Sequence, residues 1–439
     1  MATANPIPGQ RSGDCWVLIA GGFHRHGGMD RLNLALARYL LQRGGRVHLV
    51  CHRADQDLYK HGVPVDVVPR PANSFMLGGF MLARRGREVA QRMTAEFPAT
   101  RVLVNGGNCT WPDINWIHCV HHAWPRSDSY SPPWFKLKNL CARRLACAQE
   151  RSALTRARLL IANSERTRDD LLNHFGVAPG RVHVVYPGSD PAFGPACGAQ
   201  RAAARAWLKK DDRPLVVFAG ALGHDSNKGF DVLFKAWQAL CARPDWDCAL
   251  IAAGGGRAVE RWKRRTAEAG MEGRIEFTGF TDRIPDLLAA ADLLVSPVRY
   301  EAYGMNVHEA ICCGVPAMVT RTAGVAERYP AELQPLLIDD PEDSEALAVK
   351  LLRWRMAMQY WREKVAPFSE ALRAYTLEDM AKHIVALCTE NSRIEKHLRA
   401  SPLNPLLADR RLLPSSRPGA SSLGARRSDR REAIWPGFE

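Results

Sequence analysis

Three features of membrane and secreted proteins are missing from this sequence of 439 residues. No run of about 18 apolar residues occurs, so the sequence predicts no membrane-spanning helix. Residues 1–15 lack the basic, apolar and small-residue layout of a secretory signal. The 12 cysteines are scattered and form no Cys-x-x-Cys pair, which argues against a disulfide framework or a structural zinc site. We therefore expect a cytoplasmic protein.

Patterns that bind metals or dinucleotides are also scarce. Two Asp-x-Asp pairs, within residues 55–57 and 245–247, do not end an apolar strand, which is where such a pair would meet a divalent ion. Three histidines within residues 118–122 have no carboxylate at ligand spacing. The glycine-rich residues 21–28 do not contain Gly-x-Gly-x-x-Gly, so the dinucleotide fingerprint is absent. We expect neither a metal nor a cofactor.

The positive charge is unevenly distributed along the chain. In total, 60 Lys and Arg face 46 Asp and Glu, which gives a net charge of +14. Residues 1–195 hold 25 basic and 14 acidic side chains, whereas residues 196–400 hold 28 of each. The basic excess belongs to the first half, so an anionic partner should meet that half. No nucleic-acid recognition motif accompanies the charge, and we expect no nucleic-acid partner.

The first half alternates strand-like and helix-like segments. Its predicted strands are residues 15–20, 47–51, 63–68, 101–105, a short strand from 116 that ends in histidines, 159–164 and 182–186. Its predicted helices are residues 30–43, 82–96, 136–158 and a segment from an N-cap at Ser164 to Phe175. This alternation predicts a parallel sheet covered by helices on both faces.

The second half repeats the alternation. Its predicted strands are residues 214–220, 249–253, 275–280, 293–297 and 318–320, and its predicted helices are residues 286–290, 341–366 and 372–389. We therefore expect a first domain over 1–190, a flexible Ala-rich linker over 191–213 and a second domain over 214–368. A crossover helix within 369–395 and a basic tail over 396–439 follow, and the Pro, Ser, Gly and Arg content of the tail predicts disorder.

One segment, residues 299–316, carries the strongest chemical signal. It follows the buried strand 293–297, so Glu301 should lie in a strand-to-helix loop and Glu309 on the helix after it. In an open α/β sheet, ligands bind beyond the carboxyl ends of the strands, where a helix start offers free N–H groups to an anion. The amides of residues 304–306 could thus face a diphosphate, while Glu309 reaches a ribose hydroxyl.

Two glutamates separated by seven residues, in this loop and helix, resemble the signature of the retaining glycosyltransferases of family 4. Gly27-Gly28, Lys228-Gly229 and the triple glycine 254–256 follow in the order of that family. The resemblance covers most of the chain. It implies an α/β protein of the GT-B type, in which two Rossmann-like, doubly wound domains face each other across a cleft and a C-terminal helix crosses back to the first.

The resemblance also implies roles for single residues. Three would be catalytic: Glu301 on the donor sugar's hydroxyls, Lys228 on the diphosphate, and His121 on the sugar from the opposite domain, with His122 as the alternative to His121. Glu309 would bind the ribose. The implied donor-binding residues are Gly27, Gly28, Lys228, Gly229, Gly255, Gly279, Phe280, Glu301, Tyr303, Gly304, Met305, Asn306 and Glu309.

The chain departs from the family pattern at one phosphate ligand. The family has Gly-Arg at the end of the first strand of the second domain, but here Ala221 stands in place of the arginine. His224 and Arg299 are possible substitutes for the missing cation. Glu327, in a later loop, either caps a helix or contacts the sugar, and we favour the cap.

Basic side chains gather on the helix predicted over residues 136–158. Seven Lys or Arg accompany a single acid, Glu150: Lys136, Lys138, Arg143, Arg144, Arg151, Arg156 and Arg158. One interpretation is a solvated helix face. The other is a surface for an anionic acceptor or a membrane leaflet, where each basic residue near the lipid contributes about 1 kcal/mol.

The resemblance implies a retaining hexosyltransferase that moves a sugar from a nucleoside-diphosphate sugar to an acceptor, for example a lipid-linked or cell-envelope glycan. The basic first domain would permit peripheral contact with the inner face of the membrane. Two alternatives stay open: a GT-B relative such as a nucleotide-sugar epimerase or a phosphorylase, and a basic binding protein without enzymatic activity. The sugar, the base, the acceptor and the oligomeric state are not specified by the sequence.

Overall fold

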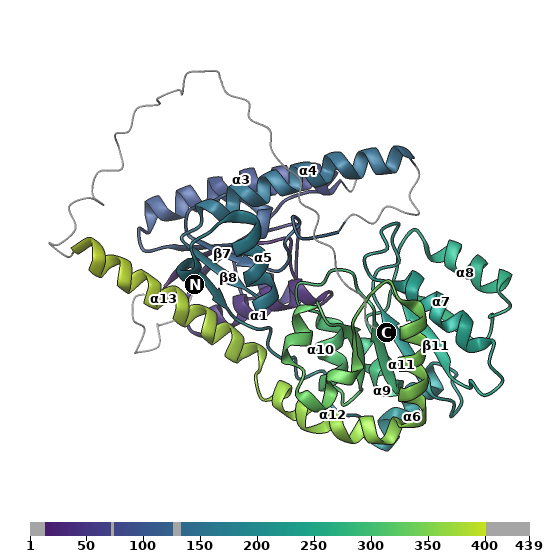
Figure 1. Ribbon diagram of the computed structural model, residues 1–439. Coiled ribbons are helices and arrows are strands. Elements are labelled where there is room, and N and C mark those ends of the chain that lie inside the picture. The colour runs from purple at the N-terminus through teal and green to yellow at the C-terminus, as the bar shows by residue number, and fades with distance from the viewer. Residues whose placement is uncertain (1–13, 72–73, 126–132, 401–439) are drawn as a thin grey trace, which may run out of the picture. The chain divides into compact units, whose positions relative to one another are not determined.

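The computed structural model describes residues 14–71, 74–125 and 133–400 (Figure 1). The chain divides into two compact units, Met1–Thr389 and Glu390–Glu439. Both large sheets and the candidate site belong to the first unit. The disordered tail expected over 396–439 lies outside the described residues from residue 401 onward.

In the described part of the first half, seven parallel strands form a sheet in the order β5-β3-β1-β6-β7-β8-β9. The strands are β1 (Cys15–Ile19), β3 (Arg46–Cys51), β5 (Val65–Val67), β6 (Arg101–Asn105), β7 (Ile114–Ile117), β8 (Leu159–Ala162) and β9 (Val182–Val184). The helices are α1 (Gly28–Gln42), α2 (Gln56–Lys60), α3 (Phe75–Glu96), α4 (Pro133–Arg156) and α5 (Glu165–Phe175). The strand order reverses between β1 and β6, as in doubly wound folds.

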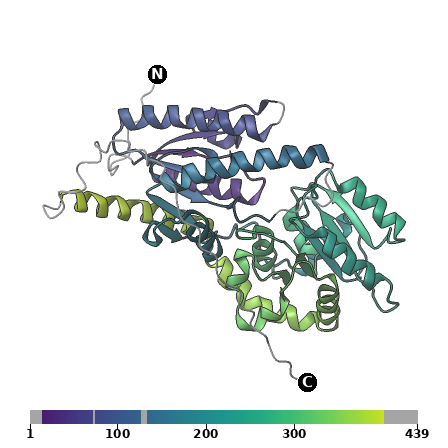
Figure 2. The ribbon, with the colours of Figure 1, turned by 45° about the horizontal axis from the view of Figure 1, so that its top comes forward.

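Side chains alternate along β1 and pack against two helical layers. Val17 and Ile19 join a cluster with α3, whereas Trp16 and Leu18 join a cluster with α1 and α13 (Leu377–Ala400). Figures 1 and 2 show α3 on one side of this sheet and the first part of α13 on the other. Because both faces are covered, the strands read as continuous apolar runs in the sequence.

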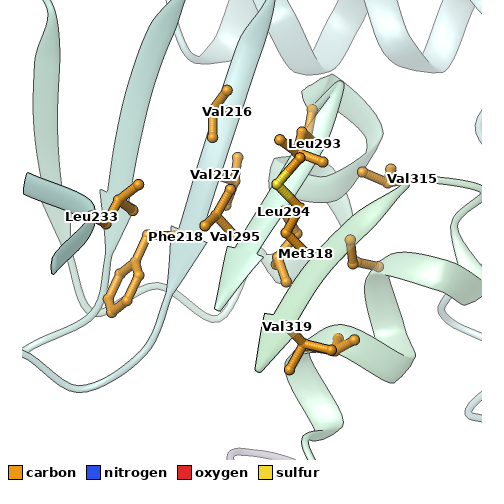
Figure 3. Packing of buried hydrophobic residues seen from close by; sticks show 14 of the residues in the cluster. Val216, Val217, Phe218, Leu233, Leu293, Leu294, Val295, Val315, Met318 and Val319 are labelled. Atoms are coloured by element: carbon orange, nitrogen blue, oxygen red, sulfur yellow. The ribbon is translucent and has the colours of Figure 1, made fainter. Parts of the chain in front are cut away.

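The second half forms a parallel sheet of six strands, counted over the described residues, in the order β12-β11-β10-β13-β14-β15. The strands are β10 (Leu215–Ala219), β11 (Ala249–Ala253), β12 (Ile275–Gly279), β13 (Leu293–Ser296), β14 (Ala317–Thr320) and β15 (Leu337–Ile338). The helices are α6 (Gly198–Trp207), α7 (Phe230–Cys241), α8 (Val259–Glu268), α9 (Ile284–Ala290), α10 (Met305–Cys312), α11 (Ser344–Met356) and α12 (Met358–Arg373). Figure 3 shows the apolar side chains of β10, β13 and β14 beside one another, among them Val217, Val295 and Met318.

The chain passes between the two sheets twice. Residues 187–190 lead from the first sheet to the second, and the chain returns between α12 and α13. On α13, Met380, Ala381 and Ile384 are fully buried in the core of the first sheet. These observations confirm the expected pair of doubly wound domains with a C-terminal helix that crosses back; the domain boundaries stay a prediction.

The segment 191–213 is not the flexible linker that we expected. It contains α6, whose Arg201 and Arg205 bind the two carboxylate oxygens of Asp292 at 2.6 and 2.7 Å. Arg205 and Asp292 are both buried. Alanine is the strongest helix former, so the same Ala-rich composition also favours a helix that is then fixed by these ion pairs.

Other boundaries also differ from expectation, four of them as follows. α3 begins at residue 75 rather than 82, because Ser74 caps it: the Ser74 hydroxyl accepts from the Leu77 N–H at 3.3 Å. The helix expected over 341–366 divides at Ala357 into α11 and α12, and the last helix begins at residue 377 rather than 372. β7 ends at residue 117, before the histidines.

Candidate active site

One cavity of about 1010 Å³ lies where the carboxyl ends of both sheets meet. Its walls come from the segments that follow β1 in the first domain and β10, β11, β12 and β13 in the second. Strand order reverses beside β1 and β10, which are the switch points where doubly wound sheets bind ligands. The sequence placed the donor site at these same loops.

Many of the predicted donor-binding residues line this cavity. They are Gly27, Gly28, Lys228, Gly255, Phe280, Met305, Asn306 and Glu309. The other predicted residues are described by the structure but are not part of the cavity wall: Gly229, Gly279, Glu301, Tyr303 and Gly304. Glu301 is nevertheless bonded to a residue of the wall, Lys228.

Gly229 and Gly304 shape the starts of two helices. Gly229 has a φ of 70°, and a Cβ there would lie 1.8 Å from the carbonyl oxygen of Pro297. Gly304 has a φ of 115° immediately before α10. Only glycine adopts such angles without strain, so both residues serve the loop geometry that brings the site residues together.

Lys228 and Glu301 form an ion pair at the end of neighbouring strands. Lys228 Nζ donates to Glu301 Oε2, and both side chains are half-buried. Burial alone would lower the pKa of Lys228, but the Glu301 carboxylate raises it above the ordinary value. Lys228 therefore stays a cation at the cavity wall, as the phosphate role predicted from sequence requires.

Two helix N-termini meet in the cavity. α1 begins at Gly28 and α10 begins at Met305, and a Cβ on Gly28 would lie 2.9 Å from Met305 Cβ. The first N–H groups of a helix have no partner within the helix and carry a partial positive charge. This part of the cavity is thus suited to an anion.

Glu309 is bound by an arginine that the sequence did not indicate. Arg31 Nη2 on α1 donates to Glu309 Oε1 on α10, and the Arg31 guanidinium lies 5.0 Å from the centre of the Phe193 ring. Burial raises the pKa of Glu309 to about 7, against the opposing effect of Arg31. The two residues are 278 positions apart, so no local pattern could have paired them.

Arg299 cannot replace the arginine missing at Ala221, and that expectation is wrong. Its guanidinium binds both carboxylate oxygens of Asp231 at 2.9 Å and also binds Glu342. Ala221 lies on the cavity wall, whereas Arg299 and His224 do not. The arginine instead fixes the loop before Glu301 to α7.

The histidines after β7 converge on the single acid of α4. Glu150 is fully buried and lies 3.1 Å from His121 Nδ1 and 2.9 Å from His122 Nδ1. Burial alone would raise the pKa of Glu150, but its hydrogen bonds with His121 and His122 lower it. Both histidines follow the end of β7, and neither lies on the cavity wall.

Tyr303 lies in the core and joins a buried hydrogen-bond chain, so we no longer expect it to contact a donor. Ser189 Oγ donates to the carbonyl of Leu372 at 2.7 Å and therefore accepts from His308 Nε2 at 2.8 Å. His308 Nδ1 then accepts from the Tyr303 hydroxyl at 2.8 Å. Burial lowers the pKa of His308 to about 3, so this histidine is neutral.

Glu327 caps a helix, as we favoured, but the helix belongs to the other domain. Its two carboxylate oxygens accept the backbone N–H groups of Glu165 and Arg166 at 2.8 and 3.1 Å, at the start of α5. Ser164, the predicted N-cap of α5, accepts from the Thr167 N–H at 3.0 Å. The second domain thus supplies part of the cap of a first-domain helix.

The basic side chains of α4 divide into two groups. Arg143 donates to the carbonyl of Trp124, Arg151 to that of His174 at 3.1 Å, and Arg158, just after the helix, to Asp113 at 2.7 Å. The others with described side chains are exposed: Lys136, Arg144 and Arg156. The Lys138 side chain lies outside the described part.

The two Asp-x-Asp pairs bind arginines of their own surroundings. Asp57 binds Arg25 at 2.9 Å, and Asp247 binds Arg355 at 2.8 Å. Over residues 14–71, 74–125 and 133–400, no three His, Cys, Asp or Glu side chains are grouped as metal ligands. In the same ranges, no helix combines the length and apolar character needed to cross a bilayer.

Two family models match the chain, one on each side of the cavity. The model described as Glycosyltransferase Family 4 matches residues 26–193, and the model described as Glycosyl transferases group 1 matches residues 213–355. Mannosylfructose-phosphate synthase of Agrobacterium fabrum is 28% identical over 240 residues, which is 52% of each chain. The chain spans about half the length of this and two further curated relatives that it matches.

Solved structures share the fold. WaaG, a glycosyltransferase involved in lipopolysaccharide biosynthesis, is 20% identical, with a TM-score of 0.67 over 84% of this chain and 99% of WaaG. HepE of Anabaena, in complex with UDP and glucose, is 20% identical, with a TM-score of 0.59 over 89% of this chain and 100% of HepE. Both agree with the two-domain architecture predicted from sequence.

Proposed function

The chain belongs to the group 1, family 4 glycosyltransferases, and from this we propose that it transfers a sugar from a nucleoside-diphosphate sugar to an acceptor with retention of anomeric configuration. One observation carries the proposal: Lys228 and the N-termini of α1 and α10 share one cavity with Glu309. Positive groups from two domains suit a diphosphate, and the carboxylate suits a ribose. HepE, which has this fold, was crystallised with UDP and glucose.

Each group has a distinct task in the proposed reaction. Lys228 and the first N–H groups of α10 stabilise the negative charge that develops on the departing diphosphate. Such preorganised stabilisation is usually the largest part of catalysis. Glu309 binds the ribose hydroxyls, and Glu301, held beside Lys228, binds hydroxyls of the donor sugar.

The histidine cluster lies on the acceptor side in this proposal. His121 and His122 are held by the buried Glu150, and the His121 ring stacks on Trp124 at 6.3 Å. We propose that His121 approaches the donor sugar when acceptor and donor are both bound. Retention by double displacement needs a carboxylate at the anomeric carbon, whereas front-face attack does not, and both routes use the same stabilising groups.

We propose a lipid-linked or cell-envelope glycan as the acceptor. The support is the basic excess of the first half and the exposed Lys136, Arg144 and Arg156 on α4. WaaG, which has the same fold, is a glycosyltransferase involved in lipopolysaccharide biosynthesis. Contact with the inner face of a membrane would follow from the same charges.

A donor screen tests the proposed function. We expect one of the UDP-, GDP- and ADP-sugars to raise the melting temperature of the wild type and to be hydrolysed slowly. Glu309→Ala should lose this stabilisation, because the ribose loses its carboxylate acceptor. Glu260→Ala is the matched control, since Glu260 is exposed on α8 and bonded only to Lys263 among the described residues.

Two results would contradict the proposal: no stabilisation by any nucleotide sugar, or an unchanged shift in Glu309→Ala with the preferred donor. Once an acceptor is known, NMR of the product's anomeric proton tests retention. Release of a free epimer or a sugar phosphate would instead identify an epimerase or a phosphorylase of the same fold.

A further inference from the structure

We propose that Arg31, on the first turn of α1, is the second cation for the donor's diphosphate and takes over the task of the arginine missing at Ala221. The inference rests on the proposed function, because it assumes a nucleoside-diphosphate donor in this cavity. It assigns a phosphate ligand to the first domain, whereas the sequence placed both phosphate cations in the second.

The position of Arg31 supports this assignment. Arg31, Ala221 and Lys228 all lie on the wall of one cavity. Arg31 follows Gly28 by three residues, and Gly28 touches Met305 at the start of α10. One turn of helix rises about 5.4 Å, so an anion held by the first N–H groups of α10 is within reach of a side chain as long as arginine.

Arg31 also has bonding capacity left. Its Nη2 donates to Glu309, while its Nε lies 3.6 Å from Asp190 Oδ2, beyond hydrogen-bond distance. Among the described residues, this buried Nε has no hydrogen-bond partner. A guanidinium has five N–H donors in a planar fork that matches phosphate oxygens, so Arg31 can bind an anion without giving up its place.

The other arginines near the cavity are committed elsewhere. Arg25 binds Asp55 and Asp57, and Arg38 also binds Asp57. Arg299 is held by Asp231 and Glu342. Among the arginines of the described cavity wall, Arg31 is the one bonded to Glu309, a glutamate of residues 299–316.

This arrangement couples two steps of donor binding. Glu309 is the carboxylate proposed to bind the ribose, and it shares its charge with Arg31. When its other N–H groups bind the diphosphate, the guanidinium keeps Nη2 on Glu309 and so holds the carboxylate in position for the ribose hydroxyls. Binding of the diphosphate thus favours binding of the nucleoside, and both require the two domains to be together.

The test compares a nucleoside diphosphate with its monophosphate by calorimetry, using the nucleoside found in the donor screen. In Arg31→Gln, affinity for the diphosphate should fall about 10- to 100-fold, and affinity for the monophosphate should fall less, because a charge-assisted phosphate bond is lost. In Glu309→Gln both affinities should fall by the same factor, so their ratio should stay that of the wild type. Arg43→Gln, at the far end of the same helix, is the control for charge and helix stability.

Rescue separates a ligand from a structural residue. Adding Ala221→Arg to Arg31→Gln restores the family's arginine and should return the diphosphate-to-monophosphate ratio toward that of the wild type. Arg31→Lys, which keeps the charge and loses the fork, should give an intermediate ratio and serves if the glutamine variant does not fold. An unchanged ratio in both Arg31 variants would overturn the role of Arg31 and leave the proposed function intact. Absence of any nucleotide binding to the wild type would overturn both.

Discussion

Glu301 and Glu309, the two glutamates of residues 299–316, are each paired with a cation, but in different ways. Glu301 pairs with Lys228, and both belong to the second domain, with side chains that are 21% and 32% exposed. Glu309 pairs with Arg31 of the first domain, and these side chains are only 9% and 15% exposed. The Lys228 and Glu301 pair joins two loops that follow adjacent strands of one sheet. The Arg31 and Glu309 pair joins helices of two different domains.

This difference separates two tasks. The geometry of the Lys228 and Glu301 pair does not depend on the position of the first domain, so this pair suits the chemical step. The Arg31 and Glu309 pair depends on α1 and α10 being in contact, so it suits recognition of the donor and closure of the cavity around it. Perturbing one pair at a time should therefore affect either turnover or binding.

The largest effect is expected from Lys228→Gln. It removes the cation proposed to stabilise the departing diphosphate, so kcat for donor hydrolysis or transfer should fall about 100- to 1000-fold while donor affinity falls less. Steady-state kinetics at saturating donor measures this. The control is Lys263→Gln, a lysine on α8 that is bonded to Glu260. A kcat within a few-fold of the wild type would remove Lys228 from the chemical step.

The second effect is a pH dependence that belongs to the Arg31 and Glu309 pair. Burial raises the pKa of Glu309 from 4.5 to about 7. In the proposed role, only the ionised carboxylate can accept from two ribose hydroxyls. Donor affinity should fall as pH drops below about 7, by at most about tenfold per unit. Calorimetric titrations between pH 5.5 and pH 8 check this, with Glu309→Gln expected to give a flat profile.

The free energy of unfolding should depend on the ionisation of Glu309 in the opposite direction to donor affinity. The folded protein binds the Glu309 proton more tightly than the unfolded chain, so this contribution is present below about pH 4.5 and is lost as pH rises to about 7. The free energy of unfolding should fall over that window by at most about 3 kcal/mol, and less in Glu309→Gln. Equal pH profiles for the two proteins would contradict the assignment.

The smallest effect is expected from Glu327→Ala. This change removes the acceptor of two N–H groups at the start of α5 and should cost about 1 kcal/mol of stability. Because Glu327 joins the two domains, donor affinity should also weaken by a few-fold, while kcat at saturating donor should stay unchanged. Glu332→Ala, an exposed residue nearby, is the control. A lower kcat would show that the two pairs are not independent.

The sequence predicted the parts of the site that are local. A buried strand, a loop and a helix follow one another within residues 293–312, so spacing alone placed Glu301 in the loop and Glu309 on the helix. The role of Lys228 was implied instead by the family resemblance, through the Lys228-Gly229 pair in the loop after β10. The carboxyl ends of parallel strands then bring these loops to one edge of the sheet.

The partners of these residues were not predictable, because they come from distant parts of the chain. Arg31 is 278 positions from Glu309, and Glu150 is 29 positions from His121. Arg299 looked like a free cation beside the motif, yet Asp231 on α7 holds it. A lone acid in a basic helix was the one visible sign that Glu150 has a special environment.

Ser189 has a mechanical consequence for the whole molecule. Its N–H donates to Tyr375 and its carbonyl accepts from Leu377, so the outgoing and returning crossings are bonded to each other at this serine. Its hydroxyl is bonded to His308, the neighbour of Glu309. A movement of one crossing would therefore move the other. The helix α10, which carries Glu309, is bonded to the same serine through His308. At Ser189 the two crossings of the chain are therefore bonded to each other and to the helix that carries Glu309.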